Sequence, residues 1–276
     1  MATIVFKVGT GAASYSNSYS VDLESSSDQY LEASGSSAFD LSTYGESFSI
    51  SMWVKPESLP SDKLLTMVSK GNAFRAYADS NNFRVFVGPT STGPSENAYI
   101  SNGGSATGVW HHVVMTYDGN SLNDSSFVAS GQFVSKIYRN ATAGTSYRAL
   151  YVGRLTNSTS ATNSNTFQIG GSDTSTTDPF LAPYSYSSFD GAIDEVSYWN
   201  KALSSSEVTE LYNSGSAADL SSHSAVSNLV SWWRMGDNAS DDLTADTGQI
   251  TDVEGSNNLI PRNTTSSSKV EDTPGS

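Results

Sequence analysis

Short runs in which every second residue is apolar recur along the chain, and they restrict its fold more than any other sequence feature. Phe48, Ile50 and Met52 share one face of the run at 48–54, and a similar run covers 83–87. Further runs occupy 110–119, 136–140, 149–153, 167–171 and 190–199. Most runs end in Gly or Asn, as strands joined by tight turns do. The pattern predicts an all-β fold, an antiparallel two-sheet jelly-roll sandwich.

One segment departs from this pattern and predicts a single short helix over 204–214. Ser204 stands at the N-cap position, and Glu207 follows three residues later as the second member of a capping box. Leu211 belongs to an apolar stripe with helical spacing, and Gly215 ends the helix. The expected core of the sandwich is Phe48, Ile50, Met52, Trp110, Val114, Ile193 and Val196.

Changes in composition divide the chain into three parts. Residues 1–18 hold a short apolar strand and a small-residue linker, residues 19–215 form the jelly roll, and residues 216–276 form a C-terminal extension. In the extension, the strand at 228–236 contains two adjacent tryptophans, so it must dock on the sandwich to stay out of water. We expect it beside the first strands of the jelly roll. The Ser/Thr-rich tail from 263 is expected to fray.

Composition excludes several classes of protein. The 276 residues contain no cysteine, which rules out disulfides, thiolate metal sites and cysteine nucleophiles. The formal charge of −14 repels phosphate backbones and anionic lipid, so nucleic acid and membranes are not expected partners. No apolar stretch has the length of a signal-peptide core or a membrane span. These features favour a cytosolically made protein or a virion component, with a secreted or cell-surface protein as the alternative.

Several segments together resemble the laminin-G-like family, which has the concanavalin A-like lectin and glucanase fold. The resemblance covers residues 19–215 and rests on YSVDLESSSDQYLEAS, FSISMWVKP, MVSKG, GVWHHVVMTYDG, KIYRN and FDGAIDEVSYWNKALSSSEVTELYNSG. It implies two face-to-face antiparallel sheets, a carbohydrate- or protein-binding role and often one calcium ion at a rim. The order of segments, with LVSWWRMGD after the domain, also resembles structural proteins of marine bacteriophages.

Asp194 is the acid that most needs an explanation. Strict alternation puts it on the same face as Val196 and Tyr198, and a buried carboxylate requires partners. Backbone amides of a neighbouring turn are one solution. A calcium ion shared with other carboxylates is the second, because hard cations take oxygen ligands. The candidate metal ligands are Asp22, Asp28, Asp190 and Asp194.

Aromatic side chains in loops are the candidate carbohydrate contacts, since pyranose rings stack on aromatic faces. Tyr184 and Tyr186 lie two residues apart in a Pro-flanked loop, and Tyr77, Tyr99 and Tyr147 lie near other turns. The alternative for each tyrosine is a structural one, in which the ring edges the core and the hydroxyl reaches water.

The sequence lacks the motifs of catalysis expected for this fold. Glucanases of this kind carry E-x-D-x-x-E on one strand, and no such string is present. Asp194 and Glu195 point to opposite sides of an ideal strand, as do His111 and His112, of which one is expected to be packed and the other exposed. We therefore predict that the protein is not an enzyme.

The predicted function is that of a non-catalytic virion-surface protein, a capsid decoration or fibre component that binds coat proteins or host glycans. The apolar strand Ile4–Phe6 could anchor it by pairing with an exposed sheet edge. A free carbohydrate-binding lectin or adhesin is the first alternative, and a glycoside hydrolase is the second. A homo-oligomer is compatible with each of them.

Overall fold

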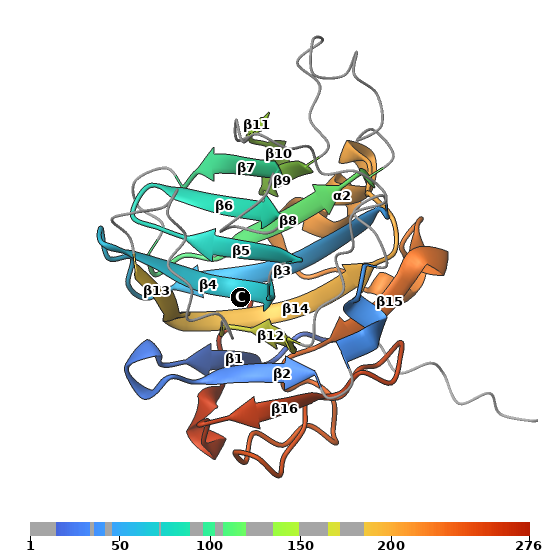
Figure 1. Cartoon of the computed structure of the whole chain (residues 1–276). Helices are drawn as coiled ribbons and strands as arrows, with labels where there is room; N and C mark the ends of the chain where they lie inside the picture. Colours follow the sequence, from blue (N-terminus) through green and yellow to red (C-terminus); the bar gives the residue numbers. More distant parts are fainter. Residues whose placement is uncertain are drawn as a thin grey trace, which may run out of the picture.

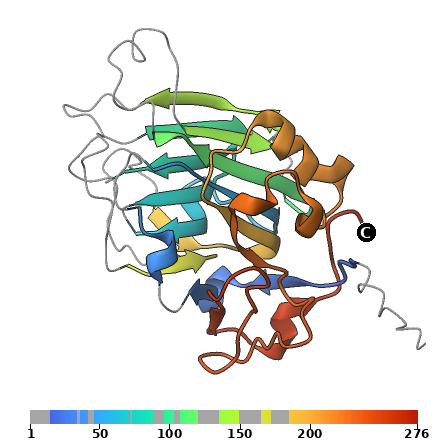
Figure 2. The ribbon, with the colours of Figure 1, turned by 90° about the vertical axis from the view of Figure 1, so that its right-hand side faces the viewer.

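A computed structural model provides the structure, and it describes most of the chain. The described residues are 15–33, 36–41, 46–71, 73–88, 96–102, 107–119, 135–148, 165–171 and 185–276. They form two β-sheets packed face to face, with additional C-terminal segments on one side (Figures 1 and 2). The predicted strands at 4–6 and 149–153 lie outside the described residues.

One sheet has eight strands. Its order is β10 (Thr142–Ala143), β9 (Ser135–Arg139), β8 (His111–Tyr117), β3 (Phe48–Pro56), β14 (Gly191–Trp199), β1 (Ser20–Leu23) and β17 (Lys269–Val270), and β15 (Leu229–Trp233) also pairs with β14. All of these pairs are antiparallel. This sheet lies behind the other one in the view of Figure 1.

The second sheet has nine strands. Its order is β11 (Thr145–Arg148), β7 (Glu96–Ser101), β6 (Asn82–Val87), β5 (Phe74–Ala78), β4 (Lys63–Lys70), β12 (Phe167–Ile169), β2 (Tyr30–Ala33) and β16 (Leu259–Arg262), and β13 (Ser185–Ser188) pairs with β4. The pair β13–β4 is parallel and the others are antiparallel. The two-sheet sandwich predicted from the alternating runs is therefore confirmed.

The main core lies between the two sheets and confirms most of the predicted core residues. Phe48, Ile50, Met52, Ile193 and Val196 are all buried in it. Aromatic rings fill its centre, where the ring of Phe48 lies 4.8 Å from that of Phe74 between ring centroids.

Two of the predicted core residues lie elsewhere. Trp110 precedes β8 and is only half-buried, and its indole nitrogen donates a hydrogen bond of 3.0 Å to Asp272 near the C-terminus. Val114 is buried, but on the outer face of the eight-stranded sheet. The prediction for Trp110 is wrong because β8 begins one residue after it, at His111.

A layer of C-terminal segments covers that outer face (Figure 2). It consists of α2 (Ser205–Tyr212) and the 3-10 turns η4 (Asn213–Gly215), η5 (Leu220–Ser222) and η6 (Val226–Asn228). Leu211 and Leu220 from this layer pack with Val114 and Trp199 of the sheet in a second apolar cluster. The layer explains why β8 is apolar on both faces.

The same layer corrects the expectation for the two histidines. His111 and His112 point to opposite faces of β8, as predicted, but both are buried. The ring of His112 lies 4.9 Å from that of Trp53, and its Nε2 is 2.8 Å from the hydroxyl of Ser51. Burial lowers the pKa of His112 to about 3, so this imidazole is neutral in the folded protein at neutral pH.

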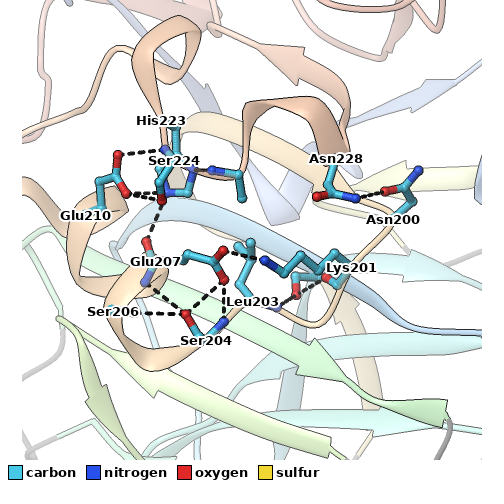
Figure 3. Close-up of polar contacts among 12 residues, drawn as sticks. Asn200, Lys201, Leu203, Ser204, Ser206, Glu207, Glu210, His223, Ser224 and Asn228 are labelled. Atoms are coloured by element: carbon cyan, nitrogen blue, oxygen red, sulfur yellow. Dashed lines mark hydrogen bonds and ion pairs between the residues drawn. The ribbon is translucent and has the colours of Figure 1, made fainter.

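Helix α2 begins as the sequence predicts. Ser204 is its N-cap, and Ser204 and Glu207 form a complete capping box (Figure 3). Glu207 also pairs with Lys201, and Glu210 accepts a 2.8 Å hydrogen bond from the backbone nitrogen of Ser224 (Figure 3). The helix ends at Asn213, which has a left-handed conformation, rather than at Gly215.

The C-terminal extension contributes strands to both sheets. The docking of the strand with two tryptophans is confirmed, but β15 pairs with β14 and not with the first strands. The tail is also not frayed in the structure, because β17 pairs with β1 and η7 (Ser266–Ser268) precedes it. In the described part of the chain, no helix is long and apolar enough to cross a membrane.

Candidate functional site

A β-bulge in β14 decides where its acidic residues point. Asp194 pairs with Trp53 and Ser197 with Ser51, so two residues of β14 face one residue of β3 between these pairs. Glu195 adopts a positive φ of 46° at this bulge, which accommodates the additional residue of β14. Asp194 therefore lies on the outer face of the sheet, and the prediction that it shares the face of Val196 is wrong.

Asp194 is fully buried, with 0% of its surface exposed. One carboxylate oxygen accepts a hydrogen bond of 2.7 Å from the backbone nitrogen of Glu195, and the other accepts one of 2.9 Å from the side chain of Asn17. Burial, followed by the charge of Glu195, raises the pKa of Asp194 well above its usual range. This amide-bonded environment is the alternative to calcium that the sequence left open.

Glu195 is also buried, but unlike Asp194 it contacts a cationic side chain, that of Arg234. Its carboxylate accepts hydrogen bonds from Arg234 at 3.3 Å, from the hydroxyl of Tyr15 at 3.1 Å and from the indole of Trp232. Burial raises the pKa of Glu195, while Arg234 and these hydrogen bonds lower it. The net effect is a Glu195 pKa raised to about 7. Since Glu195 contacts the guanidinium of Arg234, it is the acid of the pair whose charged form has a cationic partner, which favours the proton on Asp194.

These two acids connect β14 to residues 15–17 and to β15. Both carboxylates are buried and accept hydrogen bonds from these two segments. A glycosidase needs two carboxyl groups that flank a bound sugar. The pair Asp194–Glu195 is thus placed for a structural role.

The four candidate metal ligands lie in separate hydrogen-bond networks. Asp190 accepts bonds from Ser25 and Ser58, and Asp28 accepts one from Ser188. Within the described residues, no group of three or more acids and histidines is arranged to hold a metal ion. Calcium usually takes six to eight oxygen ligands, so the four aspartates do not fit one shared ion in this arrangement.

Among the four aspartates, Asp22 has a carboxylate oxygen whose hydrogen-bonding capacity is unsatisfied. Its Oδ1 is buried and has no hydrogen-bond partner in the described part of the chain. It lines a small rim pocket of about 170 Å³ with Lys55, Glu57 and Asp272. Burial, followed by the charge of Glu57, raises the pKa of Asp22 to about 6.

The outer face of the nine-stranded sheet carries a different set of side chains. The residues that alternate with the core positions Phe83, Val85 and Val87 on β6 are Arg84 and Phe86. The strand register then aligns four residues of β7, β6, β5 and β4 across the sheet: Tyr99, Arg84, Tyr77 and Thr66. We call this set the aromatic row.

Contacts within and beside the aromatic row combine ring stacking with charge. The guanidinium of Arg84 lies 6.0 Å from the ring centroid of Tyr99 and is ion-paired with Asp79. The ring of Tyr77 lies 5.9 Å from that of Phe86 on the same face. Such a face offers apolar ring surfaces with hydrogen-bonding groups between them.

Tyr186, a candidate carbohydrate contact from the sequence, extends this face. It lies on β13 opposite Leu64, and its ring is 5.2 Å from that of Tyr77. Tyr186, Tyr99 and Arg84 are half-buried, whereas Tyr77 is fully buried. The second candidate, Tyr184, lies outside the described residues, as does the side chain of Tyr147.

Sequence reasoning missed the two residues of β6 that complete this face. Arg84 and Phe86 alternate with three apolar residues in FRVFV, so the signal was present on the second face of a recognised strand. Their proximity to Tyr99 and Tyr186 comes from strand pairing, which the sequence does not reveal.

Comparison with known proteins identifies the family of this sandwich. A family model described as the Concanavalin A-like lectin/glucanases superfamily matches residues 25–209, about two thirds of the chain. The chain belongs to this superfamily. No curated protein matches the chain.

Two solved structures are similar to this chain at low sequence identity, and only the first has a TM-score above 0.5. A putative carbohydrate binding protein from Bacteroides ovatus is 16% identical with a TM-score of 0.56, and the match covers 94% of this chain and 61% of that one. The binding domain of botulinum neurotoxin DC in complex with SialylT is 16% identical, with a TM-score of 0.41 over 62% and 36% of the two chains. At these identities the likeness concerns the fold alone, and this chain spans less than two thirds of both proteins.

Proposed function

We propose that this protein is a non-catalytic carbohydrate-binding domain that holds its ligand on the outer face of the nine-stranded sheet. The observation that carries the proposal is the aromatic row with Tyr186 beside it. Carbohydrate sites present aromatic rings to the apolar faces of sugars and fix the hydroxyl groups with a few polar side chains. The name of the Bacteroides ovatus protein, a putative carbohydrate binding protein with this fold, supports the same class of ligand.

The half-buried residues define where a ligand would make contact. The backbones of Tyr99 on β7 and Tyr186 on β13 lie four strand positions apart, about 19 Å at the usual strand spacing, and the ring of Tyr186 reaches back to Tyr77 on β5. Arg84 lies between them and offers guanidinium donors to sugar hydroxyls. This separation favours an oligosaccharide over a single sugar ring.

The state of the acids near this face supports binding rather than hydrolysis. Asp79 is ion-paired with Arg84, and Glu32 is ion-paired with Arg262. A glycosidase needs two carboxyl groups that flank the bound sugar, whereas these two carboxylates are engaged by arginine side chains. We therefore expect no release of reducing sugar from marine polysaccharides that the protein binds.

A glycan array with matched tyrosine variants tests the proposal. We expect the wild-type protein to bind a defined set of oligosaccharides, and Tyr186→Ala and Tyr99→Ala each to weaken binding at least about fivefold, taking the about 1–3 kcal/mol that a nucleic-acid base gains by stacking on an aromatic side chain as a guide. Tyr212→Ala is the control, because this half-buried tyrosine stacks on Trp53 at the opposite sheet. Absence of bound glycans, or equal loss in the control, would contradict the proposal.

The same array decides the question of calcium. If a chelator abolishes binding, the prediction of a calcium ion at the rim stands, and the ligands must include residues beyond the four aspartates. If binding is unchanged, calcium has no part in the site.

The proposal extends to a virion surface, where the domain would contact coat proteins or host glycans. It is supported by the order of sequence segments, which resembles that of phage structural proteins, and by no structural observation. Sedimentation of the protein together with assembled particles is the expected result. Recovery of the protein only as a free species would favour the lectin alternative.

A further inference from the structure

Two partly exposed arginines lie on the outer face of the nine-stranded sheet, and each is paired with a carboxylate. Arg84 of the aromatic row is ion-paired with Asp79, which follows the end of β5. Arg262 on β16 forms an ion pair of 2.6 Å with Glu32 on β2 and a second ion pair with Asp246. Both guanidinium groups therefore meet a ligand with their charge already compensated.

The other basic residues that the structure describes on β4 and β5 do not present their charge to this face. Arg75 of β5 points to the outer face, but only 1% of its surface is exposed. Lys63 and Lys70 of β4 stand at inner-face positions, because Lys63 precedes Leu64 of the outer apolar cluster and Lys70 pairs with Phe74 of the main core.

Asp79 is held rigidly beside Arg84 by the turn between β5 and β6. Its Oδ1 accepts hydrogen bonds from the backbone nitrogens of Asn81 at 2.8 Å and Asn82 at 2.9 Å, and its Oδ2 accepts from Nε of Arg84. Since only 1% of the surface of Asp79 is exposed, its carboxylate cannot turn to water when a ligand arrives. The charge of Arg84 stays compensated, while the terminal nitrogens of its guanidinium offer further donors.

A compensated guanidinium distinguishes the hydroxyl groups of a sugar from its acidic groups. A hydroxyl needs only a donor or an acceptor, and the terminal nitrogens of Arg84 supply donors. A carboxylate or sulfate must lose water and needs positive charge in return, but beside Arg84 it also meets the negative charge of Asp79. The formal charge of −14 repels anionic ligands at longer range.

We propose that the aromatic row is selective for neutral oligosaccharides and rejects chains with uronate, sialic acid or sulfate at the sugars that contact Arg84. This inference rests on the proposed function, because it names the class of glycan that the same site takes. Tyr99 and Tyr186 stack on sugar rings of either class. The ion pair of Arg84 with Asp79 therefore makes the selection, and the aromatic side chains do not.

An array of glycan pairs that differ only in acidic groups tests the selectivity on the full chain. The pairs include mannan oligosaccharides with mannuronate oligosaccharides of the same length, and lactosamine chains with and without terminal sialic acid. We expect the neutral member of each bound pair to bind at least about tenfold more tightly. Its affinity should change less than about twofold between about 50 mM and about 500 mM NaCl, because no ion pair forms with the ligand.

Asp79→Asn measures the contribution of the ion pair directly. The amide oxygen can still accept from the backbone of the turn, but the counter-charge of Arg84 is removed, so the preference for the neutral member should fall at least about fivefold. Adding Arg84→Gln to this variant should abolish the gained binding of the acidic member. Asp219→Asn is the matched control and should keep the wild-type preference, because its carboxylate also accepts from a backbone nitrogen, that of Ser221 at 3.0 Å, but lies over the opposite sheet.

Two results would overturn the selectivity and leave the proposed function standing. One is an acidic member that binds as tightly as its neutral partner and is lost in Tyr186→Ala. The other is an equal preference in Asp79→Asn and Asp219→Asn, with both variants folded by circular dichroism. Absence of binding to every pair, or binding that Tyr186→Ala leaves unchanged, would contradict both proposals. The pair comparison and the salt dependence use the wild-type protein, so they decide the matter even if Asp79→Asn does not fold.

Discussion

Glu195 reverses the direction of the side chains around it on β14. Its positive φ of 46° allows Ile193 and Val196 to face the same core although they are three residues apart. The bulge turns Asp194 away from that core, toward the segment that contains Asn17. A single residue with an unusual conformation therefore decides which acids can meet.

Asp194→Asn tests whether the buried acid holds a proton. A folded-state pKa that is raised above the unfolded value stabilises the fold at low pH, and this stability is lost as pH rises through the folded pKa. The side chain of Asn at position 194 mimics the protonated acid. The buried amide oxygen of Asn17 has no hydrogen-bond partner in the described part of the chain, and after rotation of the amide it can accept a hydrogen bond from the new Asn. Relative to wild type, the variant should gain free energy of unfolding as the pH rises above about 4, the ordinary aspartate pKa.

Chemical denaturation at several pH values provides the measurement. His112 affects both proteins equally, because its lowered pKa makes folding less favourable below the ordinary histidine pKa in each. Asp62→Asn, which replaces an exposed acid, is the control. Its free energy of unfolding should change with pH as that of the wild type does. If the free energy of unfolding of Asp194→Asn changes with pH in the same way as that of the wild type, Asp194 is ionised in the folded protein.

At the scale of elements, one edge of β14 is shared by two strands that are far apart in sequence. β1 pairs with Ile193 and its neighbours toward the start of β14, and β15 pairs from Val196 onward. The bulge separates the two pairings. β1 in turn receives β17 on its other edge, so the C-terminal tail closes an edge that would otherwise be open.

Deletion of residues 264–276 should therefore destabilise the protein. It removes β17, the hydrogen bond from Trp110 to Asp272, and the 2.7 Å bond from Ser20 to the backbone oxygen of Asp272. We expect a loss of about 1–3 kcal/mol in the free energy of unfolding. Deletion of Gly275 and Ser276 alone is the control, because both are exposed. If the two deletion variants have equal free energies of unfolding, β17 does not contribute to the stability of the protein in solution.

At the scale of the whole molecule, the C-terminal extension completes both sheets and covers one of them. β16 extends the nine-stranded sheet, β15 and β17 belong to the eight-stranded sheet, and η5 and η6 lie on its outer face. Trp233 of β15 is fully buried in the main core beside Phe39. The sandwich and the extension therefore share one hydrophobic core.

Truncation after Gly215 should prevent formation of a stable monomer. The fragment lacks Trp233 from the core and the cover over Val114, and it leaves Glu195 buried without Arg234. Exposed apolar faces and open sheet edges promote association. Size-exclusion chromatography and thermal unfolding should show aggregation or loss of the folded state. A soluble monomeric fragment as heat-resistant as the full chain would refute this expectation.

Local patterns in the sequence determined the class of the fold and several of its elements. Alternation in 48–54 and 83–87 predicted strands, and the Ser204 and Glu207 pair predicted the start of α2. These predictions succeeded because side-chain periodicity and helix capping depend on residues close in sequence.

Only the tertiary structure decided which distant residues meet. The bulge at Glu195 invalidated strict alternation, and the covering layer buried His112 on a face that the sequence could not assign. Strand order brought Tyr186 next to Tyr77. The physical reason is that pairing register and layer packing are set by contacts between segments, whereas the sequence pattern reports only on the faces within each segment.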